Sequence, residues 1–193
     1  KFLVHVNEQY NMDRLEMYTI NAIENNIFNK GKYKKLDKIQ DDINDCRDFM
    51  GNICDVLSSH VNDVGKAKFK QRIVNIVDNT TDNKIKLLSN KIDGYYLSLT
   101  KLRAKSLKSN LPNKVKITDK YTLNSKNLIF KQLSKGNTKI FFPELNTRSD
   151  KLITLYENIK TSVFDEYIKR LEVYQEKYGF MFRKIVEFVG LID

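Results

Sequence analysis

The stretch LDKIQDDINDCRDFMGNICDVLSSHVNDV, residues 36–64, decides the fold, because small or apolar side chains recur in it at steps of three and four residues. We call such a row of positions, which share one face of a helix, a seam. Its members here are Leu36, Ile39, Ile43, Cys46, Met50, Ile53, Leu57, His60 and Val64. A seam of this kind over four heptads predicts one long helix that packs along a partner helix. Charged residues such as Asp41 and Asp48 lie between the seam positions and suit a solvated outer face.

A second seam occupies the C-terminal part of the chain, at Leu152, Tyr156, Ile159, Val163, Tyr167, Leu171, Tyr174, Tyr178, Met181, Ile185, Phe188 and Ile192. It predicts a helix of about forty residues, roughly 60 Å long. Pro143 is expected to end the element before it, and Asn146 or Thr147 to cap the new helix. Residues 11–28 are also compatible with a helix. Two such seams predict an antiparallel helix pair, with the residues between them inserted at its tip.

The inserted residues have the composition of short strands. Five segments are rich in β-branched and aromatic residues, namely 72–77 (RIVNIV), 84–89 (KIKLLS), 95–100 (YYLSLT), 114–118 (KVKIT) and 138–142 (TKIFF). Turn-forming residues separate them, including Asp93-Gly94 and Lys135-Gly136-Asn137. Residues 101–109 fit either a short helix or a loop. The predicted fold class is therefore α+β, mainly α, with long antiparallel, coiled-coil-like helices and a small antiparallel sheet at the tip.

Positive charge is concentrated in the middle of the chain. Residues 60–143 contain 18 Lys and Arg against 5 Asp and Glu, whereas the remaining residues contain 16 against 19. The net charge of residues 60–143 is thus +13, and that of the remaining residues is −3. This asymmetry indicates a polyanionic partner, and the alternative is a solvated basic face with no partner.

Several function classes lack their motifs. The sequence has no Gly-rich loop followed by Lys and Ser or Thr, no nucleophile elbow and no metal-spaced histidines, since His5 and His60 are its only two. Cys46 and Cys54 do not have the spacing of a zinc motif and are expected to be buried free thiols in a reducing compartment. No apolar run approaches the ~20 residues of a membrane span. We therefore expect an intracellular, membrane-free chain that has no catalytic site.

Four segments resemble the lever and clamp region of the MutS mismatch-repair family. Residues 29–38 (NKGKYKKLDK) are similar to the family's glycine followed by ELDELR, and residues 93–100 (DGYYLSLT) to its FGYYIEVT strand. Residues 132–145 (QLSKGNTKIFFPEL) resemble QTLKNAERYIIPEL, and residues 191–193 (LID) resemble LDVL at the end of the ascending helix. The chain departs from the pattern at 66–83, which is longer and more basic, and at Asn137-Thr138-Lys139, which replaces AER.

The resemblance implies a division into three parts. Residues 1–65 would hold an N-terminal helix and the descending lever helix, residues 66–143 the basic β-rich clamp, and residues 144–193 the ascending lever helix. Lys1 is not an initiator Met, and we expect the chain to be part of a longer protein. The mismatch-recognition and nucleotide-binding domains would lie in that protein, a DNA-dependent ATPase using ATP and Mg and acting as a homodimer or heterodimer. The Asn, Lys and Ile bias suits an AT-rich source such as a large DNA virus, with the protein in the nucleus, the cytoplasm or a viral factory.

The function predicted from charge and resemblance together is binding of the duplex DNA backbone without reading of its sequence. The candidate DNA-binding residues are Lys101, Arg103, Lys105, Lys131, Lys135, Gly136, Asn137 and Lys139. Two alternatives remain open at this point. One is a helical protein-interaction module with an incidental basic tip, and the other is a binder of single strands or RNA that uses an aromatic sheet.

Overall fold

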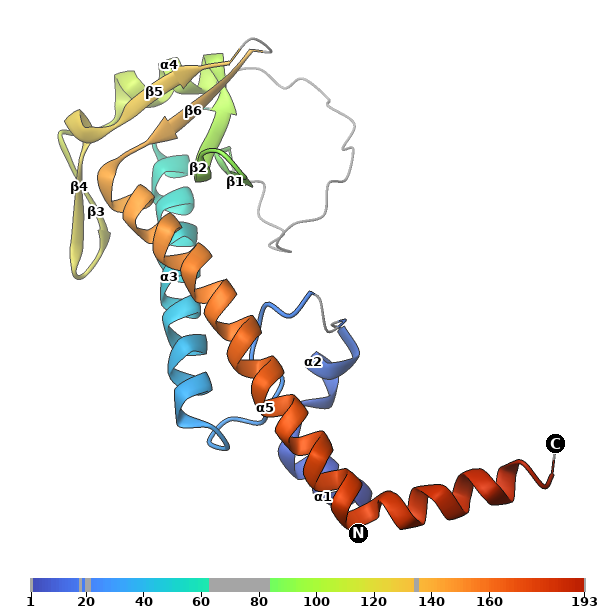
Figure 1. Ribbon diagram of the computed structural model, residues 1–193. Coiled ribbons are helices and arrows are strands. Elements are labelled where there is room, and N and C mark those ends of the chain that lie inside the picture. The colour runs from blue at the N-terminus through green and yellow to red at the C-terminus, as the bar shows by residue number, and fades with distance from the viewer. Residues whose placement is uncertain (1, 18, 20–21, 63–83, 134–135, 193) are drawn as a thin grey trace. The chain divides into compact units, whose positions relative to one another are not determined.

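The computed structural model describes residues 2–17, 19, 22–62, 84–133 and 136–192 (Figure 1). They form two packing units, one of Lys1–Ile43 with Thr154–Asp193 and the other of Asn44–Ile153. The strand predicted at residues 72–77 lies outside the described residues. The predicted three-part division follows chain order, whereas the units follow packing, and that division stays a prediction.

Two long helices are the main elements of the fold. Helix α3 spans Lys34–Ser59 and helix α5 spans Pro143–Val189. The helix predicted from the first seam is confirmed as far as Ser59, and Leu36, Ile43, Met50 and Leu57 are all buried. His60 lies beyond the end of α3, and Val64 lies outside the described residues. Each packing unit contains a contact of α5 with α3 or with the residue directly before it. In one unit Arg170 Nε donates a hydrogen bond to Tyr33 Oη at 2.5 Å, and in the other the Arg148 guanidinium lies 4.8 Å from the Phe49 ring centroid.

Strand β6, Asn137–Phe141, ends as expected of an element that precedes Pro143. Helix α5 begins at Pro143 itself, so the predicted cap at Asn146 or Thr147 is wrong. Proline is well suited to the first position of a helix, where its fixed φ is already helical and a backbone N–H has no intrahelical acceptor. Thr147 lies one turn after Pro143, and its hydroxyl donates a hydrogen bond to the Pro143 carbonyl at 3.1 Å.

The unit that holds the N-terminus contains two short helices, α1 at Phe2–Gln9 and α2 at Met12–Met17. The helix expected over residues 11–28 is therefore wrong for residues 22–28. Residues 22–28 have irregular structure, and polar side chains hold them to α3. Asn26 is buried, and its backbone N–H donates to Gln40 Oε1 at 2.7 Å while its side chain donates to Asp37 Oδ1 at 3.2 Å. A buried Asn that satisfies its own hydrogen bonds in this way favours a loop over a helix interior.

The other unit contains a four-stranded antiparallel sheet with the order β1-β2-β6-β5. Its strands are β1 at Lys86–Asn90, β2 at Gly94–Thr100, β5 at Ile129–Gln132 and β6 at Asn137–Phe141. A separate hairpin pairs β3, Lys114–Thr118, with β4, Tyr121–Asn124. Helix α4, Lys101–Asn110, follows β2 directly, and a short 3₁₀ helix, Ser125–Asn127, leads to β5. The predicted mainly helical α+β class with a small antiparallel sheet is confirmed, and residues 101–109 are helical.

The sheet has two chemically different faces because side chains alternate along each strand. Phe130, Gln132 and Thr138 face α4, together with the fully buried pair of Leu97 and Ile140. We call this the α4 face. The opposite face carries Lys86 and Leu88 of β1, Tyr96 and Ser98 of β2, Ile129 and Lys131 of β5, and Lys139 and Phe141 of β6. The predicted site residues that lie in strands, Lys131, Asn137 and Lys139, therefore all alternate onto the face opposite α4.

Candidate nucleic-acid interface

Helix α4 presents three lysines along one side. Thr100 caps its N-terminus, where the hydroxyl accepts a hydrogen bond from the Arg103 N–H at 3.3 Å. Lys101, Lys105 and Lys108 follow at spacings of four and three residues, which places them on one helix face. All three are exposed, while Ala104 and Leu107 of the same helix are buried. The helix thus packs on the sheet through small apolar residues and turns its cations to solvent.

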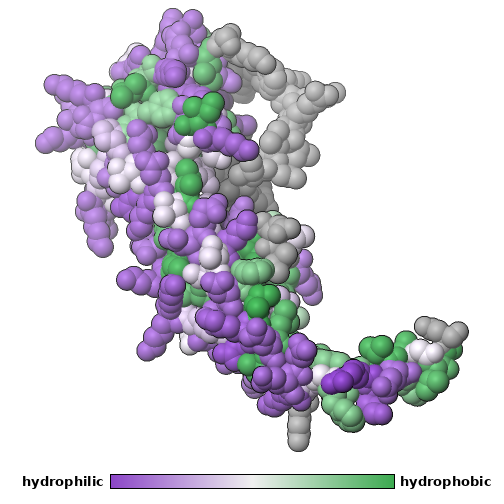
Figure 2. All heavy atoms as spheres, in the orientation of Figure 1, coloured by the Kyte–Doolittle hydropathy of each residue, from purple (hydrophilic) through white to green (hydrophobic). Residues whose placement is uncertain are grey.

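Two adjoining hollows lie beside these lysines, of about 60 and 230 Å³. Lys108 and Phe130 line both, and the Lys108 ammonium lies 4.3 Å from the centroid of the Phe130 ring. We call the combined feature the α4–β5 groove; its walls are formed by Lys101, Ala104, Lys105, Lys108, Leu111, Asn113, Ser125, Lys126, Leu128, Phe130, Gln132 and Thr138. Four of these residues are lysines and none of them is a carboxylate. Hydrophilic residues dominate the surface over α4 and β5 (Figure 2).

The turn between β5 and β6 adjoins the start of α4. Gly136 has a positive φ of 78°, and the Leu133 N–H donates to the Asn137 carbonyl at 2.8 Å. The Lys101 N–H donates to the Gly136 carbonyl at 2.9 Å, so a backbone hydrogen bond ties the turn to the helix. Four predicted site residues, Lys101, Lys105, Gly136 and Asn137, therefore meet at one end of the sheet. Lys135 lies outside the described residues.

The other predicted site residues lie elsewhere. Lys131 is exposed on the face opposite α4. Arg103 is half-buried and donates to the Lys84 carbonyl at 3.1 Å. Lys139 is only 8% exposed, and its ammonium lies 2.5 Å from Asp93 Oδ2 and 4.0 Å from the centroid of the Tyr96 ring. DNA contact by these residues stays a prediction, and Lys139 has in addition an observed role in packing.

The electrostatics of this part of the chain favour an anion. The sequence from 84 to 142 contains 14 Lys and Arg against 2 acids, an excess of 12. Both acids pair with lysines, Asp93 with Lys139 at 2.5 Å and Asp119 with Lys116 at 2.7 Å. The hydrogen bond from Lys139 holds the pKa of Asp93 below its ordinary value, assisted by a second hydrogen bond from Asn90. The remaining cations therefore face an approaching phosphate without an unpaired carboxylate beside them in the described part of the sheet.

Sequence reasoning did not select three residues of the groove, Lys108, Lys126 and Phe130. The spacing of Lys101, Lys105 and Lys108 carries the signal for Lys108, but only once residues 101–110 are known to be helical. Lys126 and Phe130 carry no comparable signal, because the 3₁₀ helix and β5 that position them were not predicted.

Other kinds of site find no support in the described residues. Within ranges 2–17, 19, 22–62, 84–133 and 136–192, no three His, Cys, Asp or Glu residues cluster as metal ligands. The helices in the same ranges do not include one long and apolar enough to cross a membrane. The sequence lacks a Gly-rich phosphate loop, so its residues do not fit the ATP and Mg that the resemblance implies for a longer protein.

Comparison with known proteins relates the whole chain to a viral protein, although no family model matches it. The chain is a distant homologue of a protein of Acanthamoeba polyphaga mimivirus described as "Putative DNA mismatch repair protein mutS homolog", with 27% identity over 203 aligned positions. The alignment covers 100% of this chain and 17% of the viral protein. The four motifs predict a relation to MutS proteins, and this distant homology to a MutS homologue confirms it. The region of a MutS protein to which the chain corresponds stays a prediction.

Proposed function

We propose, from this distant homology to a MutS homologue and from the α4–β5 groove, that the chain binds the backbone of duplex DNA without reading its sequence. The observation that carries the proposal is the lining of the groove. It contains four lysines and no carboxylate, and an exposed backbone turn adjoins it. Lysine ammonium groups contact phosphates as point charges and carry no information about the bases. Binding of this kind depends on the release of counterions and weakens as salt rises.

In this proposal residues 66–143 act as the clamp of a MutS-like mismatch-repair protein, and residues 1–65 and 144–193 supply its lever helices. Lys101, Lys105, Lys108 and Lys126 contact phosphates, and the Gly136–Asn137 turn approaches the same strand. Arg103 and Lys139 position the sheet, because each already has an acceptor within the protein. The DNA partner implies an intracellular place of action, and the dimer expected of a longer MutS protein would bring two such clamps to one duplex.

The test compares two variants with equal loss of charge in a fluorescence-anisotropy titration against a random-sequence duplex at several salt concentrations. The first variant changes Lys101, Lys105, Lys108 and Lys126 to Gln. The control changes four exposed lysines of the other packing unit to Gln, namely Lys32, Lys34, Lys35 and Lys38. Neutralising four phosphate contacts should reduce the log–log salt slope by about 3.6, and the control should keep the wild-type slope.

The result decides the proposal in either direction. An absence of wild-type binding at low salt contradicts duplex binding, and equal slopes for the two variants contradict the assignment to the groove. Competition with single-stranded oligonucleotides separates a duplex binder from a single-strand or RNA binder, because the latter would prefer the single strand.

A second function, a helical protein-interaction module, is favoured by one observation. The C-terminal part of α5 exposes large apolar side chains, among them Phe180, Val186 and Phe188 at 72%, 70% and 63% (Figure 2). An apolar surface of this kind is typical of a helix that packs against a partner. Sedimentation velocity of the wild type and of a Phe180→Ser, Val186→Ser, Phe188→Ser variant tests this function. A smaller species for the variant, together with no wild-type binding to duplex, would favour the interaction module over DNA binding.

A further inference from the structure

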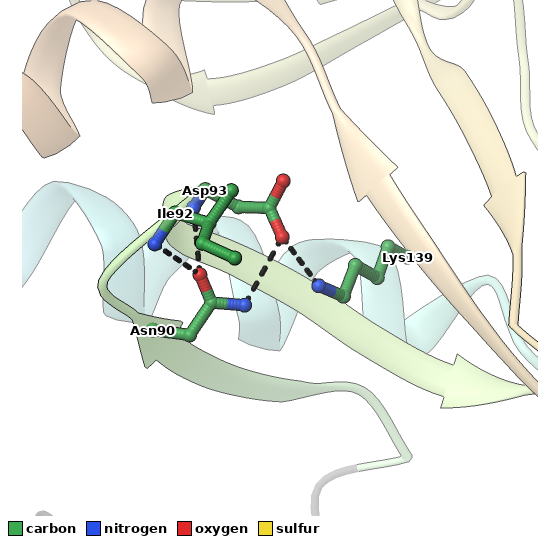
Figure 3. Close-up of polar contacts among 4 residues, drawn as sticks. All are labelled: Asn90, Ile92, Asp93 and Lys139. Carbon is green, nitrogen blue, oxygen red and sulfur yellow. Dashed lines mark hydrogen bonds and ion pairs between the residues drawn. The ribbon is translucent and has the colours of Figure 1, made fainter.

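The turn between β1 and β2 is held by its own side chains (Figure 3). Asn90 Oδ1 accepts hydrogen bonds from the backbone N–H groups of Ile92 at 2.9 Å and Asp93 at 2.6 Å. The Asn90 amide group donates to Asp93 Oδ2 at 3.0 Å. Asn side chains that bond to backbone N–H groups two or three residues ahead stabilise a turn. These three bonds fix the backbone on both sides of Ile92.

Lys139 of β6 adds a contact from a strand that is not part of this hairpin. Its ammonium bonds to the same Asp93 oxygen that Asn90 contacts, and it lies over the Tyr96 ring of β2. The carboxylate of Asp93 thus has two donors and a paired charge. The turn is consequently anchored to the sheet, and its one acid does not repel a phosphate.

Ile92 is 93% exposed, the highest fraction among the exposed large apolar residues of the described chain. Exposed Lys91 precedes it, whereas exposed Lys86 lies at the other end of β1. A single exposed apolar residue usually needs no explanation. Ile92 differs because a network of hydrogen bonds holds its backbone in place, directly after an exposed lysine. A side chain presented in this way loses little conformational entropy when it enters a partner.

We propose that the β1–β2 turn inserts Ile92 into the minor groove of duplex DNA, with the neighbouring Lys91 contacting a flanking phosphate. The inference rests on the proposed function, and it adds a second contact of a different kind. Apolar residues that enter the minor groove unstack neighbouring bases and bend the duplex. Charge complementarity selects this partner, since Lys91 precedes Ile92, basic residues outnumber acids 14 to 2 over residues 84–142, and Asp93 is neutralised by Lys139.

The geometry of the sheet allows both contacts on one duplex. The β1–β2 turn lies at the Gly94 end of β2, while Thr100 at the other end pairs with Asn137 beside the β5–β6 turn. Six residue steps of about 3.3 Å separate these ends by roughly 20 Å. That distance corresponds to about six base pairs at 3.4 Å per step. The α4–β5 groove and Ile92 can therefore contact neighbouring segments of the same DNA.

The test uses the full chain and pairs Ile92→Ala with Ile129→Ala. Ile129 lies on β5 and is 62% exposed, so it controls for the loss of an exposed isoleucine from the same sheet. We expect Ile92→Ala to weaken duplex binding about fivefold to tenfold, of the size of a lost apolar contact, with an unchanged salt slope because no charge is removed. Ile129→Ala should stay within twofold of the wild type.

A second readout is the energy transfer between dyes at the ends of a 20-base-pair duplex, which rises when the DNA bends. The wild type and Ile129→Ala should raise it, and Ile92→Ala should not. Wild-type affinity and wild-type bending for Ile92→Ala would overturn the inference and leave the proposed function intact. No duplex binding by the wild type would overturn both. A change in oligomeric state without a change in DNA affinity would instead assign Ile92 to a protein contact and overturn the inference.

Discussion

Replacement of Gly94 by alanine tests how the β1–β2 hairpin is attached to α5. Gly94 has a φ of +65°, and a Cβ added there overlaps the hydroxyl oxygen of Ser149. That oxygen is buried and accepts a hydrogen bond from the Tyr95 N–H at 2.8 Å. The left-handed backbone costs alanine about 1–2 kcal/mol, and displacement of the hydroxyl from a buried hydrogen bond costs about 1–3 kcal/mol. Gly94→Ala should therefore destabilise the fold by about 2–5 kcal/mol.

Two comparisons isolate these contributions. Gly136 has a φ of +78° with open space around its Cβ position, so Gly136→Ala should show only the backbone strain of about 1–2 kcal/mol. In a Gly94→Ala, Ser149→Ala double variant the nearest side-chain atoms would be Ile153 Cδ1 at 3.5 Å and Ser149 Cβ at 3.7 Å. Both are ordinary contact distances. The double variant should consequently be less destabilised than the sum of the two single variants.

Urea unfolding followed by far-ultraviolet circular dichroism measures these free energies. Equal destabilisation by Gly94→Ala and Gly136→Ala would refute the role of Ser149. Strict additivity in the double variant would show that Gly94 and Ser149 do not compete for the same space. Either result would remove the argument that glycine is required at position 94 by a close approach of α5.

Two further predictions concern ionisable groups. The Lys139 hydrogen bond lowers the pKa of Asp93 in the folded state, so this carboxylate stabilises the fold above its unfolded pKa of about 3.8 and loses that effect as pH falls through the folded value. The stability difference between the wild type and Asp93→Asn should accordingly be larger at pH 7 than at pH 3 in urea unfolding, and a pH-independent difference would contradict the pairing. Burial raises the pKa of the Cys54 thiol to about 12, so a thiol reagent at pH 8 should modify it slowly in the native protein and rapidly in urea. Fast native modification of Cys54, measured by mass spectrometry, would show that the thiol is accessible.

The long helices could be predicted because their signal is repeated many times. The seam from Leu36 to Leu57 and the one beginning at Leu152 each contain enough apolar positions to outweigh local exceptions. The start of α5 could not be predicted in the same way. A proline can both follow the end of one element and occupy the first turn of the next. No local pattern shows that the helix begins at Pro143 and not at a cap three or four residues later.

The sheet and the groove were predicted in part. The segments at 95–100 and 114–118 alternate clearly, whereas Ile129–Gln132 has four residues and no clear alternation, so β5 was not recognised. The sequence of α4 fits a helix or a loop, because the helix buries only Ala104 and Leu107 and so has no long apolar pattern. Lys101, Lys105, Gly136 and Asn137 were nevertheless selected and do lie together. The pairing of Lys139 with Asp93 spans 46 residues, and no local pattern carries such information.

The transition from sheet to helix has a mechanical consequence. Strand β6 ends at Phe141 and α5 begins at Pro143, so a single residue, the fully buried Phe142, connects them. A joint of one buried residue has almost no slack and cannot stretch or swivel as a flexible linker would. A force or torque applied to β6 must therefore rotate the first turns of α5 or remove Phe142 from its buried position. The sheet and that end of the helix consequently move as one rigid unit.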